Sequence, residues 1–308
     1  MSVFVGICMV KPTSRALIIR VITSPNIFAF TTISRLGQQH PPEDPPMTIL
    51  EPYIPKEYLA LKINYCKQKL AELPEVVVKE RKIKGATKNV YLVKNHIYLP
   101  DSKTGAKLQS VMQQRELLLC DLTKYEGLWN SNFRKLPPPD IEPRKIIRSY
   151  LNNNNDPVIM DSVFFNNLKN DADPFYPDNK KFFYNGTYYR STAEVDIARY
   201  YTEQEIPFKY EPEIWINGLS YAIYPDFVFL IKELDLCKFH EHFGMKNFAN
   251  YAQSLQVKCS NYFNAGLVMD FDVISTYNFD SIPFDVRMLS TKINHAVYDS
   301  LFAVDIPY

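Results

Sequence analysis

The chain has 308 residues and a formal net charge of +1, with 46% hydrophobic and 22% charged residues, a composition typical of a chain that buries a core. Such a balance gives no overall attraction for nucleic acid, so any basic surface must be local. Five scattered Cys residues without a CxxC pair, and the absence of GxxxxGK[ST] and GxGxxG, argue against structural zinc, a secreted disulfide framework and nucleotide chemistry.

The first 46 residues differ in composition from the rest of the chain. They contain four basic residues, many Ser and Thr, and no acidic residue before Glu43. This pattern favours an extension, either disordered or upstream of a working start at Met47, and we predict such an extension over residues 1–54. An organellar targeting segment is the alternative. The longest apolar run is too short to cross a bilayer, so we expect no membrane association and a reducing, cytoplasmic location.

Residues 55–135 predict a helix, a β-hairpin and a second helix. Apolar residues three and four apart from residue 55 to 73 indicate an amphipathic helix that ends at Pro74. Two β-rich runs, EVVVKERKIKG and NVYLVKNHIYLP, flank a turn near Gly85. A further helix is predicted over residues 107–129. We expect the whole region to be an accessory to a C-terminal domain.

The predicted hairpin is rich in basic residues. Between residues 76 and 110 there are two acids and eight basic residues, namely Lys79, Arg81, Lys82, Lys84, Lys88, Lys94, Lys103 and Lys107. A basic hairpin can follow the phosphates of a nucleic acid. The same run also suits a solvated face that guards against edge-to-edge strand pairing. Both interpretations remain open at this point.

Residues 136–179 predict a connector. LPPPDIEP is stiff and extended, RKIIRSYL suggests a short helix, and the Asn tract over residues 152–155 favours a turn.

From residue 180 onward the pattern changes to a series of strands and helices. A β-like run, FFYNGTYY, precedes a helix that Ser191 or Thr192 caps and that runs to Gln204. EPEIWI is predicted as a strand, and Asn217-Gly218 as the tight turn that leads into the returning strand LSYAIYPDFVFLI.

Three more elements and a closing helix complete the chain. LCKFHEHFGM is a predicted strand, residues 248–264 a helix, LVMDFDVISTY a buried strand, and Pro283 the start of a final helix. The order is therefore helix, strand, strand, strand, helix, strand, helix.

Three acidic residues of this region stand out. Asp226 and Glu241 each interrupt an apolar strand, where an unpaired carboxylate would be costly to bury. Glu194 lies in the first turn of the preceding helix, where a surface position is the alternative. Carboxylates are the preferred ligands of Mg²⁺ and Mn²⁺, which neutralise a scissile phosphate and activate water. The three acids therefore predict a divalent metal site.

The element order and the motifs resemble a known nuclease class. Arg190-Ser191-Thr192-Ala193-Glu194, the YPDF tetrapeptide around Asp226 and the EHFGM box at Glu241 are similar to boxes of uncharacterised bacterial and phage proteins of the PD-(D/E)xK superfamily. The resemblance is strong after Arg190 and looser from Tyr58. It implies an α/β, restriction-endonuclease-like domain over residues 180–308. The implied activity is hydrolysis of DNA more than RNA, with Asp226 and Glu241 as primary metal ligands and Glu194 assisting.

The chain departs from this family pattern at one catalytic position. The motif lysine belongs two residues after the acid, where this sequence has Phe243. We expect Lys258 on the following helix to supply the missing charge. His242, which points to the opposite face of an ideal strand, is the alternative as general base or additional ligand.

Two rival functions fit the same sequence. The missing strand lysine suits a nucleic-acid-binding protein that keeps the fold without catalysis. Alternatively, His240 and His242 share one strand face and, with Glu241, suit a zinc-dependent hydrolase. His240 is expected to have a structural role. The aromatic residues expected to lie in the core, instead of forming a base-stacking platform, are Tyr188, Tyr189, Tyr200, Tyr201 and Phe208.

Overall fold

The computed structural model describes residues 56–83, 85–134, 136–175, 179–245, 248–279 and 284–302. The predicted extension over residues 1–54, and Pro283 as the start of the last helix, lie outside the described residues. The described residues all belong to one compact unit.

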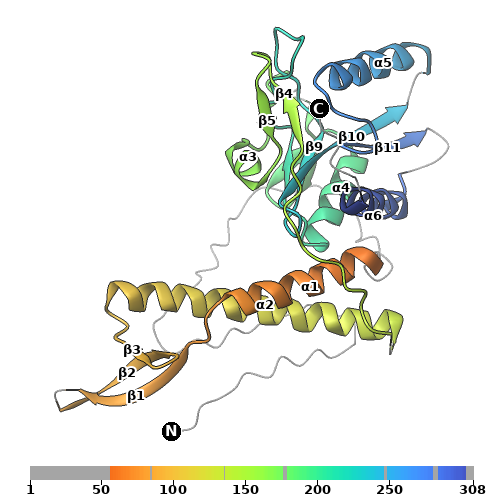
Figure 1. The fold of residues 1–308 in the computed structure, drawn as a ribbon. Coiled ribbons are helices and arrows are strands. Elements are labelled where there is room, and N and C mark those ends of the chain that lie inside the picture. Colours follow the sequence, from red (N-terminus) through yellow and green to blue (C-terminus); the bar gives the residue numbers. More distant parts are fainter. Residues whose placement is uncertain are drawn as a thin grey trace, which may run out of the picture. The chain divides into compact units, whose positions relative to one another are not determined.

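Helices and strands alternate in a mixed α/β arrangement (Figure 1). The helices are α1 Lys56–Glu72, α2 Lys103–Phe133, α3 Ser162–Asn167, α4 Thr192–Glu203, α5 Phe248–Asn264 and α6 Val286–Phe302. The strands are β1 Val77–Ile83, β2 Ala86–Val93, β3 His96–Tyr98, β4 Ser149–Leu151, β5 Pro157–Ile159, β6 Phe182–Tyr184, β7 Thr187–Tyr189, β8 Phe208–Tyr210, β9 Phe227–Ile231, β10 Leu236–Met245 and β11 Val273–Phe279. Within the described part of the chain, no helix combines the length and apolar character that a membrane crossing needs.

The largest sheet has the strand order β11-β10-β9-β8. β10 pairs in parallel with β11 and antiparallel with β9, and β8 pairs antiparallel with β9. The parallel pair needs a crossover, which α5 provides. The order from α4 to α6 is helix, strand, strand, strand, helix, strand, helix, as predicted, although its first strand is β8 and not the predicted EPEIWI.

Alternating side chains bury both faces of this sheet. Phe227 and Phe229 pack in one apolar cluster with residues of α4 and α6. Val228 and Leu230 face the other way, into a second cluster that contains Tyr262 of α5 and residues of α3 and β4. Because both faces of β9 are covered, its sequence is a continuous apolar run and does not alternate between apolar and polar residues. Asp226, which directly precedes this strand, is therefore buried.

The helix–hairpin–helix prediction for the front part holds with adjusted bounds. α1 ends at Glu72, just before Pro74, and α2 begins earlier than predicted because Ser102 caps it through the N–H of Gly105. The second β-rich run divides into β2 and β3 at Lys94, whose φ is 52°. The hydrophobic cluster that contains α4 and α6 also contains residues of α1 and α2.

Several predictions from local pattern are wrong. The returning strand LSYAIYPDFVFLI is a strand only over Phe227–Ile231, so Asp226 precedes the strand instead of interrupting it. RKIIRSYL does not form a helix: its backbone bonds elsewhere, with the N–H of Ile146 donating to Leu234, and its last residues form β4 against β5. EPEIWI is not a strand either. The strand is β8, just before it, and Ile214 keeps only an isolated bridge to Ile223. The cause is Glu211, whose φ of 43° ends the extended conformation.

A buried ion pair joins α1 to the turn between β9 and β10. Lys62 Nζ lies 3.3 Å from Glu233 Oε1, and their side chains are 1% and 0% exposed. The ammonium group also stands over the ring of Tyr58, 4.5 Å from its centroid. Burial lowers the pKa of Lys62, and Glu233 opposes that shift.

Removing one member of this pair should destabilise the fold. We expect Glu233→Leu to lower the free energy of unfolding by about 3–5 kcal/mol, because it leaves the Lys62 charge buried and unpaired. The double variant Lys62→Met/Glu233→Leu should recover most of that loss. The exposed pair of Lys69 and Glu72 is the control, since Glu72→Gln should cost no more than about 1 kcal/mol. Urea denaturation measures all of these variants, and equal losses for Glu233→Leu and Glu72→Gln would contradict the assignment.

Candidate functional site

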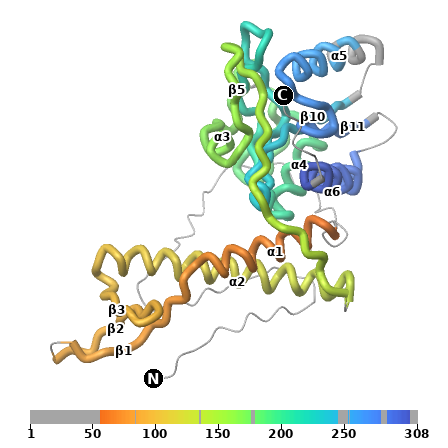
Figure 2. Tube along the Cα trace, in the orientation of Figure 1, coloured from red at the N-terminus to blue at the C-terminus, as the bar shows by residue number. Residues whose placement is uncertain are grey.

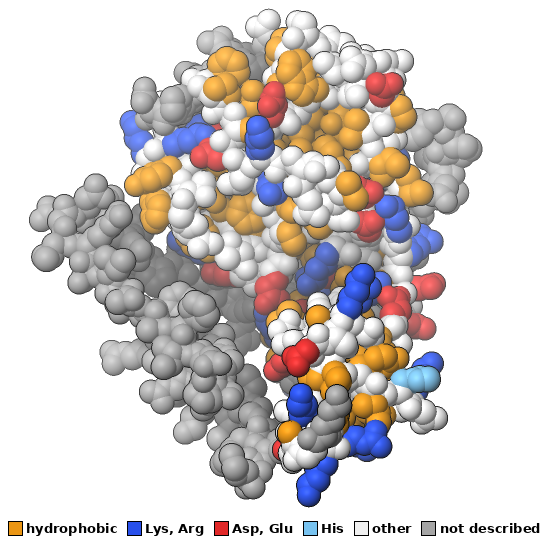
Figure 3. Space-filling view, turned by 90° about the vertical axis from the view of Figure 1, so that its left-hand side faces the viewer, with side chains coloured by type: hydrophobic (Ala, Val, Ile, Leu, Met, Phe, Trp, Pro, Cys, Tyr) orange, Lys and Arg blue, Asp and Glu red, His pale blue; other side chains and the backbone are white. Residues whose placement is uncertain are grey.

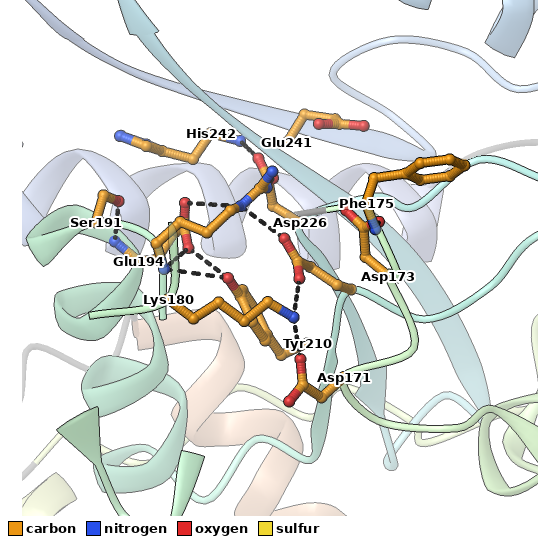
Figure 4. Close-up of polar contacts among 12 residues, drawn as sticks. Asp171, Asp173, Phe175, Lys180, Ser191, Glu194, Tyr210, Asp226, Glu241 and His242 are labelled. Carbon is orange, nitrogen blue, oxygen red and sulfur yellow. Dashed lines mark hydrogen bonds and ion pairs between the residues drawn. The ribbon is translucent and has the colours of Figure 1, made fainter. Parts of the chain in front are cut away.

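The three acids singled out from the sequence lie close together. Glu194 comes from the first turn of α4, Asp226 directly precedes β9, and Glu241 lies in β10. Their exposed fractions are 6%, 4% and 1%, so Glu194 is not a surface helix acid. Asp226 raises the pKa of both other carboxyls by charge repulsion, and it lies between them in Figure 4.

A fourth acid, Glu211, joins this cluster. The pairing of β8 with β9 ends at Tyr210 and Phe227. The next residues, Glu211 and Asp226, share one backbone hydrogen bond of 3.0 Å, in which the N–H of Glu211 donates to the carbonyl oxygen of Asp226. Glu211 is 0% exposed and has a φ of 43°. A left-handed backbone at a non-glycine residue is strained, and such strain often accompanies a functional site. Sequence reasoning missed Glu211, because an acid at the start of a supposed strand carries no local sign of burial.

Arg190 connects three of the four carboxylates. Its Nη2 lies 2.8 Å from Asp226 Oδ1 and its Nε lies 2.7 Å from Glu211 Oε1 and 3.9 Å from Glu194 Oε1. Burial alone would lower the pKa of Arg190, but the three carboxylates outweigh it and raise that pKa. Arg190 therefore serves as the shared cation of Glu194, Glu211 and Asp226.

Glu241 has its own partners on α5. Its Oε1 accepts a hydrogen bond of 2.5 Å from the hydroxyl of Tyr262, and its Oε2 lies 2.7 Å from Lys258 Nζ. At the position of the missing motif lysine, Phe243 stacks on Tyr277. Lys258 thus reaches the acid from the neighbouring helix, where the sequence predicted it.

The two histidines of β10 point to the opposite face. Both ring nitrogens of His240 are occupied, Nδ1 by the hydroxyl of Tyr201 at 2.8 Å and Nε2 by Thr276 Oγ1 at 2.8 Å. Burial lowers the pKa of His240 to about 3. His242 Nδ1 shares the same Thr276 hydroxyl at 2.9 Å, while its backbone N–H donates to Asp226 Oδ2 at 2.7 Å. β10 pairs with β11 through this region without a bulge, so the His242 ring stays away from Glu241.

The cluster is short of positive charge. Four buried carboxylates (Glu194, Glu211, Asp226 and Glu241) face three cations (Arg190, Lys180 and Lys258), which leaves a net charge of −1 if all of them ionise. One of these cations, Lys180, is also shared with a further acid, Asp171. Burial, followed by repulsion from Asp226, raises the pKa of Glu194 to about 7. Burial also raises the pKa of Glu211 and of Glu241, although neighbouring cations oppose the shift. Protons or a further cation must balance this excess.

The possible ligand atoms of the cluster are the carboxylate oxygens of its four acids, and hard divalent cations such as Mg²⁺ prefer oxygen ligands. The oxygens of Glu211 lie within ion-pair distance of Arg190 and Lys180, yet they accept no well-directed hydrogen bond from a described residue. No set of three or more His, Cys, Asp or Glu side chains in the described ranges is arranged as a ready-made metal cage. The guanidinium of Arg190 instead stands among the carboxylates. A metal ion would therefore have to share or replace that cation.

The aromatic residues of α4 belong to the core. Tyr200 is 3% exposed and Tyr201 is 0% exposed, and Tyr201 stacks with Phe229 at a centroid distance of 5.4 Å. The expected core position is confirmed for these two residues and for Tyr189, which is 2% exposed, whereas Tyr188 is 48% exposed.

No family model matches the chain, and no curated protein or solved structure matches it. The resemblance to the PD-(D/E)xK superfamily remains a prediction from the motifs.

The raised pKa of Glu194 has a measurable consequence for stability. A carboxyl whose native pKa is about 7 binds protons more readily in the folded chain than in the unfolded chain, where its value is near 4.5. Stability is therefore lost as the pH rises through this window. We expect Glu194→Gln to raise the free energy of unfolding at pH 8 by roughly 1–3 kcal/mol, and the gain should vanish below about pH 4.5. Urea unfolding across this range measures it.

The control for this experiment is Glu116→Gln, which changes an exposed acid of α2. The free energy of unfolding of the Glu116→Gln variant should change with pH as that of the wild type does. A Glu194→Gln variant that is less stable than the wild type at pH 8 would show that ionised Glu194 supports the fold.

Proposed function

We propose that this chain is a metal-dependent nuclease that hydrolyses phosphodiester bonds, with its active site at Glu194, Asp226 and Glu241. The observation that carries the proposal is the convergence of carboxylates from a helix and two adjacent β segments, each at most 6% exposed and jointly short of positive charge. A buried excess of carboxylate has little structural use, since apolar residues of similar size would serve the fold better.

The architecture supports a restriction-endonuclease-like core as part of the proposal. A mixed sheet has helices packed on both faces. The order of its elements along the chain, from α4 to α6, is the order of that class. The acids lie at the end of the sheet where β8 and β9 diverge.

Asp226 and Glu241 would hold Mg²⁺ or Mn²⁺, with Glu194 and Glu211 close by. A bound ion would neutralise charge on the phosphate and lower the pKa of the attacking water. Asp226 is oriented by the N–H of His242, and Glu241 by the hydroxyl of Tyr262. Glu194, with a pKa of about 7, exchanges a proton near neutral pH and suits acid–base work.

Lys258 is the proposed stabiliser of developing negative charge. Its side chain is 46% exposed while its ammonium group contacts Glu241, so it can meet a substrate phosphate without leaving the site. An amine placed where charge develops lowers the barrier without rearrangement. DNA is proposed over RNA on the family resemblance alone.

The rival functions make different demands on these residues. A zinc site on His240 and His242 must displace Tyr201 or Thr276 from a ring nitrogen of His240, and Glu241 points to the other face of β10. These contacts favour the carboxylate site over the zinc hypothesis. An inactive relic would keep the fold while losing its affinity for divalent ions.

Cleavage assays test the proposal directly. Wild-type protein should cut plasmid or single-stranded DNA with Mg²⁺ or Mn²⁺ and stop when a chelator is added. Asp226→Asn should lower the rate at least ~10²-fold, because metal activation contributes several kcal/mol, and it should also weaken Mn²⁺ binding in a calorimetric titration. Asp270→Asn is the matched control, since Asp270 is exposed and pairs with Lys292. Equal cleavage by the wild type and Asp226→Asn would refute the assignment.

A second pair of variants separates Lys258 from His242. We expect Lys258→Met to lower kcat by about 10²–10³-fold, as the loss of one electrostatic stabiliser does, with little effect on Mn²⁺ affinity. His242→Asn keeps the backbone N–H that donates to Asp226, so it should lower kcat much less. The reverse order of effects, measured at saturating substrate, would assign the role to His242.

A further inference from the structure

The hairpin of β1 and β2 has a free two-stranded end. β3 pairs only with Tyr91, Leu92 and Val93 of β2. Beyond that point, residues 79–83 and 86–90 pair with each other alone (Figure 2). A two-stranded hairpin without a third strand is only marginally stable in water, and among the described residues of this end only Val90 is buried. The composition of this end therefore matters for its stability.

The register places three basic side chains on one face of this end. Arg81 lies directly opposite Lys88, and Lys79 lies two residues along β1 on the same face. All three side chains are exposed, and none makes an ion pair with a residue of the described chain. In Figure 3, Lys and Arg side chains surround the lower part of the view, where the hairpin faces the reader.

A like-charge pair directly opposite on two strands destabilises a hairpin. Exposed cations on the two strands also guard the edges against pairing with another chain, but that role does not require Arg81 and Lys88 to lie directly opposite each other. The arrangement therefore costs stability in the isolated chain. A polyanion bound across this face would remove the repulsion.

The shape of the hairpin favours double-helical nucleic acid over a membrane surface. A two-stranded β-ribbon has the width that the major groove of DNA admits, with phosphates on both sides. The exposed large apolar residues of this sheet, Val77, Val78 and Ile97, lie near β3 and not at the basic end. A membrane-binding hairpin would need such residues at its tip.

We propose that the two-stranded end of the β1–β2 hairpin binds the phosphate backbone of duplex nucleic acid through Lys79, Arg81 and Lys88. This inference rests on the proposed nuclease function for the identity of the polymer and assigns the hairpin as a second contact with the substrate, separate from the catalytic carboxylates.

Binding of a fluorescent 25-base-pair DNA duplex to the full chain tests the proposal, with chelator present so that no cleavage occurs. The triple variant Lys79→Gln/Arg81→Gln/Lys88→Gln should reduce the slope of log affinity against log salt by about 2–3 and lower the affinity at least ~10-fold. Its stability should equal or exceed that of the wild type, since the repulsion is gone. The matched control, Lys67→Gln/Lys69→Gln/Lys292→Gln, removes the same charge from ion-paired lysines elsewhere and should keep the wild-type slope.

Two outcomes would overturn the inference. The first is an equal salt slope for the two triple variants. The second is a hairpin triple variant that loses binding to phosphatidylserine vesicles but binds DNA as the wild type does. The cleavage assay keeps this result apart from the nuclease proposal. If the wild type binds duplex through the hairpin but cuts nothing with Mg²⁺ or Mn²⁺, the catalytic assignment fails and the hairpin assignment stands. If the hairpin variant cuts with unchanged kcat and raised KM, both hold.

Discussion

Charge balance among four buried carboxylates is the constraint on which the rest of this structure depends. Glu194, Glu211, Asp226 and Glu241 lie where β8 and β9 separate, and the chain supplies Arg190, Lys180 and Lys258 to face them. Taking several carboxylates out of water is costly unless cations or protons compensate. The compensation here is incomplete, as the raised pKa of Glu194 indicates. A site that sacrifices stability in this way is better explained by chemistry than by folding.

The scaffold around the cluster holds each acid in place. The covered sheet gives β9 and β10 no freedom to shift, because a slip of one residue would turn their apolar side chains from one cluster to the other. Tyr210 donates to Glu194, and Tyr262 donates to Glu241, each from a buried position. On the opposite face of β10, the contact of His240 with Thr276 fixes the parallel pairing with β11. Rigid elements therefore carry the candidate catalytic groups, as precise chemistry requires.

The basic hairpin and the acidic cluster would contact different parts of the substrate in the proposed nuclease. Carboxylates repel a phosphodiester backbone until cations intervene, so affinity for such a substrate would have to come from elsewhere on the chain. The overall charge of +1 supplies none. The exposed basic residues of β1 and β2 would supply that affinity without adding charge to the acidic cluster.

Local pattern in the sequence determined much of this protein. It predicted α1, β10, α5 and a cap of α4 at Ser191 or Thr192, because periodicity and capping act over a few neighbouring residues. It also marked Asp226 and Glu241, since an acid within an apolar stretch is anomalous wherever that stretch lies, whereas Lys258 was expected from the family resemblance. Only the tertiary structure decided the rest. Residues 144–151 did not form the predicted helix because the N–H of Ile146 donates to the distant Leu234 and residues 149–151 pair with β5, and Glu211 became a buried acid only through Arg190, Lys180 and a left-handed backbone. The contacts of Ile146 and Glu211 join residues far apart in the chain, so no local pattern encodes them.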